Sequence, residues 1–85
     1  MRLVVDANEL LKFLLLLHER IEVIPSSDLV PFLRDAKQLS PDPKDVQYFA
    51  AALRLNCPLW SEDKLLKRQE RVKVVNTAEL MHELE

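Results

Sequence analysis

Glycine is absent from the sequence, and this absence excludes several kinds of binding site. A phosphate-binding loop and a dinucleotide fingerprint both need glycine where the backbone approaches a phosphate, so neither can occur here. Tight hairpin turns also favour glycine, which weighs against an antiparallel meander. Cys57 is the one cysteine, so an intramolecular disulfide and a zinc site with several thiolates are excluded too.

Net positive charge and long hydrophobic runs are also missing. Twelve Lys and Arg stand against fourteen Asp and Glu, and a net charge of −2 does not by itself point to nucleic acid. In the leucine-rich segment the longest apolar run is residues 13–17, far short of the roughly 20 residues that span a membrane. The chain opens on a strand-like segment, so we expect no cleavable leader. A lone free thiol and no leader favour a cytoplasmic protein, and the short apolar runs predict no membrane partner.

What the sequence contains is an alternation of short apolar strands and helices. With 85 residues, 48% of them apolar, the chain is expected to fold as one domain, residues 1–85. Strands are predicted at residues 2–5, 21–24, 58–60 and 72–75, and helices at residues 9–20, 28–38, 43–55, 62–69 and 78–84. This alternation predicts an α/β fold with right-handed crossovers. We expect a small three-layer α/β/α unit with a roughly four-stranded parallel sheet.

Several side chains are predicted to begin or end these helices. Ser26 and Ser27 offer N-caps for the helix at 28–38. Asp42 precedes a proline and fits an N-cap, because proline is favoured at the first helical position. Asn56 fits the left-handed residue that ends a helix. Ser61 and Thr77 are the predicted N-caps of the last two helices.

Three carboxylates are placed where α/β folds put chemistry. Asp6 follows the first strand, Asp45 opens the helix at 43–55, and Asp63 comes shortly after the third strand. Ligands of open α/β sheets bind beyond the carboxyl ends of the strands. Acids gathered there repel one another unless a cation neutralises them, and Mg²⁺ or Mn²⁺ prefers such oxygen ligands. The pattern indicates metal-dependent phosphoryl chemistry. The alternative is that each acid only caps a helix or favours a helix N-terminus.

The segments that contain these acids form a longer pattern. It consists of Leu-Val-Val-Asp-Ala-Asn at residues 3–8, the helix at 42–53, Ser-Glu-Asp within 59–66, and the strand at 72–77. In this order the segments resemble the PIN-domain ribonucleases, with the Thr/Ser-x-Asp motif of that family at residues 61–63.

The resemblance implies a Mg²⁺- or Mn²⁺-dependent ribonuclease. By resemblance the metal ligands and catalytic acids are Asp6, Asp45 and Asp63, while Asn8 and Ser61 support the site by hydrogen bonds. Many small prokaryotic members are toxins of toxin–antitoxin pairs, so the implied partners are RNA and an antitoxin-type protein.

The chain departs from the family between Asn8 and Ile21. Members usually have a helix pair, a strand and a further site acid there, whereas this sequence has one leucine-rich helix. One site acid is therefore missing, and we expect weak or lost activity. The alternative is a non-catalytic remnant that acts in protein association.

A basic cluster follows Asp63 and is a candidate for binding RNA phosphates. At α-helical spacing its members share one face: Lys64, Lys67, Arg68 and Arg71. The alternative is a solvated basic helix face. Trp60 and Phe49 are predicted to lie in the core rather than to stack on bases, and Tyr48 is the aromatic residue expected to be exposed.

The helix at 9–20 has almost no polar face, because residues 10–17 are nearly all apolar. A small sheet can cover only one side of such a helix. We therefore expect a homodimer in which this helix packs on its symmetry mate. The alternative is a monomer in which the helix at 28–38 covers it.

Overall fold

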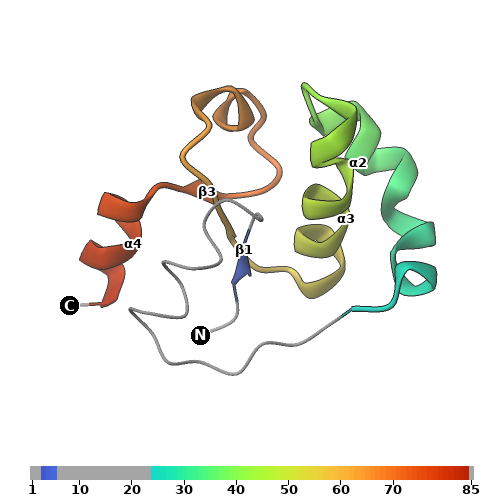
Figure 1. Ribbon diagram of the computed structural model, residues 1–85, viewed down its shortest axis with the longest axis horizontal. Helices are drawn as coiled ribbons and strands as arrows, with labels where there is room; N and C mark the ends of the chain where they lie inside the picture. Colours follow the sequence, from blue (N-terminus) through green and yellow to red (C-terminus); the bar gives the residue numbers. More distant parts are fainter. Residues whose placement is uncertain (1–2, 6–23, 85) are drawn as a thin grey trace.

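The computed structural model describes residues 3–5 and 24–84. The elements in these ranges are β1 (Val4–Val5), the 3₁₀ helix η2 (Ser26–Phe32), α2 (Leu33–Leu39), the 3₁₀ turn η3 (Pro43–Asp45), α3 (Val46–Leu55), β2 (Leu59–Trp60), the 3₁₀ helix η4 (Lys64–Arg68), β3 (Val74–Val75) and α4 (Thr77–Leu84) (Figure 1). The predicted α/β alternation is confirmed across this part of the chain. The helix predicted at 9–20 and residues 21–23 of the second predicted strand lie outside the described residues.

The sheet is parallel, as predicted, with the order β1-β2-β3 among the described strands. The described sheet thus has three strands where about four were expected. Each strand contributes two residues, which form two rows across the sheet. Val4, Leu59 and Val74 are in register in one row, and Val5, Trp60 and Val75 are in register in the other.

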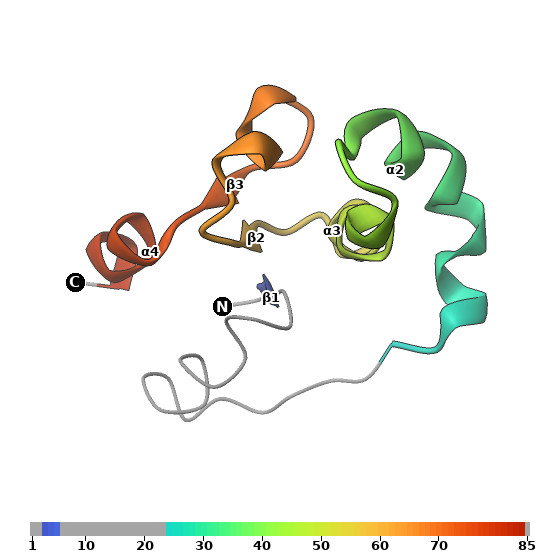
Figure 2. The ribbon, with the colours of Figure 1, turned by 45° about the horizontal axis from the view of Figure 1, so that its top comes forward.

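The two rows face different helices, which makes the fold three-layered. Val4, Leu59 and Val74 join the core cluster that contains Phe49 of α3. Trp60 and Val75 pack instead with Leu80 of α4. Figure 2 shows α3 and α4 on opposite sides of the strands. The expected α/β/α arrangement is therefore present.

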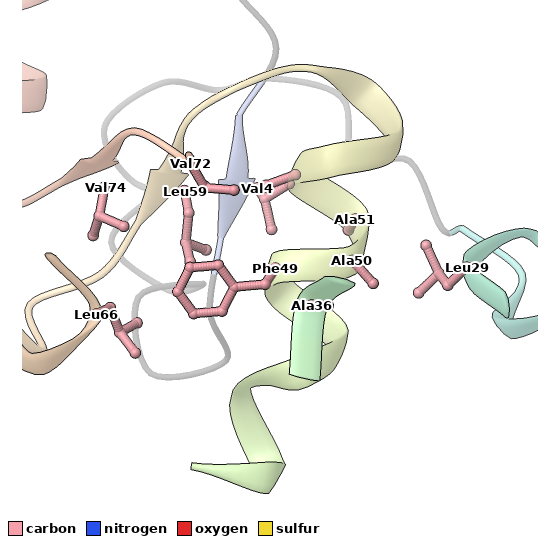
Figure 3. Packing of buried hydrophobic residues seen from close by; sticks show 11 residues of the cluster. Val4, Leu29, Ala36, Phe49, Ala50, Ala51, Leu59, Leu66, Val72 and Val74 are labelled. Atoms are coloured by element: carbon pink, nitrogen blue, oxygen red, sulfur yellow. The ribbon is translucent and has the colours of Figure 1, made fainter. Parts of the chain in front are cut away.

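The larger core lies between α3 and the strands. Figure 3 shows the Phe49 ring extending from α3 toward Leu59 of β2, and this ring is completely buried. On the other side of α3, α2 packs closely because Ala36 and Ala50 are both fully buried and small. Phe49 and Trp60 are core residues, as predicted. Tyr48 is half-buried and packs against this core rather than being exposed.

The predicted helix at 28–38 begins as a 3₁₀ helix and becomes α-helical only at Leu33. Pro31 accounts for the difference, because it has no amide proton to donate and its ring crowds the preceding turn. Ser26 and Ser27 are not the N-caps of this helix, because they already lie inside the 3₁₀ helix and Pro25 occupies the cap position. The end of α3 is as predicted: Asn56 adopts φ 50° and ψ 53°, the left-handed conformation. None of the helices in the described ranges combines the length and the apolar character needed to cross a membrane.

Candidate functional site

Asp63 lies on the loop that follows β2, and hydrogen bonds fix its backbone. The Ser61 side chain is buried, and its Oγ accepts a hydrogen bond from the Asp63 amide at 3.1 Å. Asp63 Oδ1 in turn accepts from the Leu65 amide at 3.0 Å. The N-cap of η4 is therefore Asp63, not Ser61 as predicted. The prediction was wrong because the Ser61 hydroxyl binds the amide of Asp63 before the helix begins.

The basic segment after Asp63 is a 3₁₀ helix of five residues, not the predicted α-helix at 62–69. Gln69 explains this difference. Its Nε2 donates to the Leu66 carbonyl at 3.0 Å, the carbonyl that an α-helix would pair with the amide of residue 70. The same amide group donates to the Val72 carbonyl at 2.8 Å, and Gln69 Oε1 accepts from the Val72 amide at 2.8 Å. Gln69 thus closes the loop between η4 and β3.

Asp45 is half-buried at the start of α3. The preceding η3 turn is capped by Asp42, which accepts from the Lys44 amide at 3.0 Å, so this N-cap was predicted correctly. Asp45 makes no side-chain capping hydrogen bond to α3. Side-chain capping therefore describes Asp42 and Asp63, while Asp45 occupies the N-cap position of α3, where a negative charge favours the helix N-terminus.

The described acids of the predicted site lie at one edge of the sheet. A turn at residues 56–58 joins α3 to β2, so α3 runs back against the strands, and its start lies at the edge where the strands end. Figure 1 shows the light-green segment before α3 and the orange η4 both at the top of the molecule. Asp6, which directly follows β1, and Asn8 both lie outside the described residues. Within those residues there is no group of three His, Cys, Asp or Glu side chains able to hold a metal ion.

Two members of the predicted basic cluster pair with acids of other elements. Lys67 Nζ pairs with Glu79 of α4, and Arg71 Nη1 lies 3.1 Å from Asp35 Oδ2 of α2. Lys64 and Arg68 are exposed, and neither makes an ion pair within the described part of the chain. These two side chains are the cations beside Asp63 whose charge no described acid neutralises.

The start of α4 has a capping box that the sequence prediction missed. Asn76 Oδ1 accepts from the Glu79 amide at 2.8 Å, and Glu79 Oε1 accepts from the Asn76 amide at 3.0 Å. The predicted cap, Thr77, is the first residue of the helix instead. The Asn-x-x-Glu spacing was the signal that could have identified this cap. The hydrogen bond from Lys67, followed by that from the Asn76 amide, lowers the pKa of Glu79 below its ordinary value of 4.5.

Comparison with protein families supports the resemblance noted from the sequence. A family model described as PIN domain matches residues 2–85, nearly the whole chain. Neither a curated protein nor a solved structure matches the chain. The three-layer fold and the acid after β2 agree with this match. The chain therefore belongs to the PIN-domain family, whose members are generally nucleases that use divalent metal ions.

Proposed function

We propose that this chain is a Mg²⁺- or Mn²⁺-dependent endoribonuclease domain with weak activity, in which Asp6, Asp45 and Asp63 bind the metal. The observation that carries the proposal is the placement of Asp45 and Asp63 on separate segments at the carboxyl edge of a parallel sheet. Ligand sites of such sheets lie at this edge. Weak activity follows from the site acid that the shortened segment after Asn8 lacks.

The donor atoms of the described acids fit a divalent metal ion. Asp63 is exposed, and its Oδ1 is used by the Leu65 amide, whereas its Oδ2 makes no hydrogen bond or ion pair to the described residues. Carboxylate oxygens are the ligands that Mg²⁺ and Mn²⁺ prefer. When bound, such an ion polarises a phosphodiester and lowers the pKa of a coordinated water.

Lys64 and Arg68 are the side chains that we propose for binding the RNA backbone. Both are exposed on η4, directly after Asp63, and both are without an ion pair in the described ranges. Lys67 and Arg71 contribute less, because binding RNA would first require them to leave Glu79 and Asp35. Since each phosphate contact releases counterions, RNA binding should weaken as the salt concentration rises.

The test is cleavage of single-stranded RNA during a Mn²⁺ titration. We compare the wild type with the double variant Asp6→Asn with Asp63→Asn, and with the matched control Asp28→Asn with Asp35→Asn. Both doubles remove two negative charges, but the control acids pair with arginines of α3 and of the loop before β3. Metal-dependent cleavage should persist in the control and disappear in the site variant. Cleavage that survives in the site variant would place the active site elsewhere.

The second candidate function is protein association by a non-catalytic remnant, which the missing site acid favours. Its partner would be a second copy of this chain, joined through the leucine-rich helix at residues 10–17, or an antitoxin-type protein. That helix lies outside the described residues. A wild type that dimerises but neither binds Mn²⁺ nor cleaves RNA would favour this candidate.

A further inference from the structure

Two residues that flank Ser61 are tied to the first residue of α4. Glu62 Oε1 accepts a hydrogen bond from the Thr77 amide at 2.6 Å and another from the Thr77 hydroxyl. Thr77 Oγ1 also accepts from the indole Nε1 of Trp60 at 3.1 Å. The Trp60 side chain is completely buried, so the hydroxyl of Thr77 joins the core to an exposed carboxylate.

These bonds fix the stretch of backbone that leads to Asp63. Trp60 and Glu62 are both held by Thr77, and Ser61 between them is buried and binds the Asp63 amide. A second contact with α4 lies five residues after Glu62, because Lys67 of η4 pairs with Glu79 of α4. The loop that carries Asp63 is thus attached to α4 at two places.

A carboxylate suits the position of Glu62. The first amides of a helix lack partners inside the helix, and the helix dipole favours a negative charge there. Asn76 Oδ1 accepts the hydrogen bond of the Glu79 amide. The Thr77 amide donates instead to Glu62, which lies fifteen residues earlier in the chain. Glu62 therefore caps α4 and, by the same hydrogen bonds, holds the loop before η4.

We propose that Glu62 and Thr77 are positioning residues for Asp63. The loop position that they fix matters for metal binding because of the proposed function above, on which this inference rests. The competing explanation is that Glu62 only caps α4. The two explanations differ at the Asp63 amide, which is bound by Ser61 and is not part of α4.

The first measurement is amide hydrogen exchange in the metal-free protein, with the indole resonance of Trp60 as the probe of Thr77. Glu62→Ala removes the hydrogen bonds from Thr77 to the carboxylate, and Thr77→Val removes those made by the hydroxyl. In each variant the rate of exchange at the Asp63 amide should rise by about tenfold. Glu62→Gln keeps the acceptor oxygen and Thr77→Ser keeps the hydroxyl, so in both variants the Asp63 amide should exchange at nearly the wild-type rate. The matched control is Glu70→Ala, which removes an exposed acid from the next loop, between η4 and β3.

The second measurement is the dissociation constant for Mn²⁺. Glu62→Ala should raise it by about tenfold, whereas Glu62→Gln and Glu70→Ala, which lose the same charge, should change it little. Unchanged exchange at Asp63 in both Glu62→Ala and Thr77→Val overturns the inference, as does faster exchange confined to α4. If Glu62→Ala does not fold, Glu62→Asp, which shortens the side chain by one methylene, takes its place. A wild type without Mn²⁺ affinity contradicts the proposed function, while the exchange still decides whether Glu62 positions Asp63.

Discussion

Gln69 should contribute more to stability than any exposed glutamine of this chain. Its side chain makes three hydrogen bonds to the backbone, two to the carbonyls of Leu66 and Val72 and one to the Val72 amide. At about 1 kcal/mol of net free energy for each bond, Gln69→Ala should lower the free energy of unfolding by about 2–3 kcal/mol. A domain of this size is expected to have only about 4–13 kcal/mol in total.

The assay is urea unfolding followed by circular dichroism, with Gln38→Ala as the control. Gln38 is exposed on α2 and makes no side-chain hydrogen bond within the described residues. For Gln69→Ala, the slope of the unfolding free energy against urea concentration should equal that of the wild type. In a thermal scan, its melting temperature should be about 10–20 °C below that of the wild type. A loss below about 0.5 kcal/mol, equal to that of the control, would refute the assignment of these bonds.

The near-isosteric variant Gln69→Glu tests the two hydrogen bonds that Gln69 donates separately from the one that it accepts. It keeps an oxygen for the Val72 amide but turns a carboxylate toward the carbonyls of Leu66 and Val72. The folded state should therefore raise the pKa of this carboxyl above its ordinary value of about 4.3. A raised pKa means that the variant is most stable below that value and loses stability as the pH rises through the folded pKa. Stability that is independent of pH in this range would contradict the geometry.

Three further outcomes are expected. Asn56→Ala should lower the free energy of unfolding by about 1 kcal/mol because alanine resists the left-handed conformation, whereas Asn56→Gly should not; urea unfolding measures both. The pKa of Glu79 is lowered chiefly by the hydrogen bond from Lys67, so its stabilising effect is present above 4.5 and is lost as the pH falls through the folded pKa. Urea unfolding of the wild type and of Glu79→Gln across that pH range should show that the difference between their free energies of unfolding becomes smaller in acid. Sedimentation equilibrium should show a homodimer that Leu14→Glu with Leu17→Glu breaks, and a wild-type monomer would exclude this interface.

The features that the sequence predicted well are those set by neighbouring residues. The end of α3 at Asn56 and the cap at Asp42 depend on local backbone preference, and both are confirmed. The parallel sheet follows from apolar runs separated by helices, and its described strands lie within predicted ranges. The position of Asp63 just beyond β2 is a further consequence of that alternation.

The features that the sequence could not predict depend on residues far apart in the chain. The partner of Lys67 is twelve residues away and that of Arg71 is 36 residues away, so a helical face drawn from local spacing missed both. The side chain of Gln69 replaced an α-helical hydrogen bond with a tertiary one. At α4, local preference allowed both Asn76 and Thr77 as the cap. In the structure Asn76 accepts from the Glu79 amide, and Glu62, which lies fifteen residues from Thr77, accepts from the Thr77 amide, so the start of α4 is capped from two segments.

The pairing of β1 with β2 has a consequence for the order in which the molecule is assembled during synthesis. Val4 pairs with Leu59, 55 residues later, whereas Leu59 and Val74 are only 15 residues apart. Closing the longer loop costs about 1 kcal/mol more in chain entropy, so β2 and β3 should pair first once both are made. Of the three described strands, β1 is then the first to be made and the last to join the sheet. The edge where Asp45 and Asp63 lie is therefore complete only after β3, at residues 74–75, has been translated.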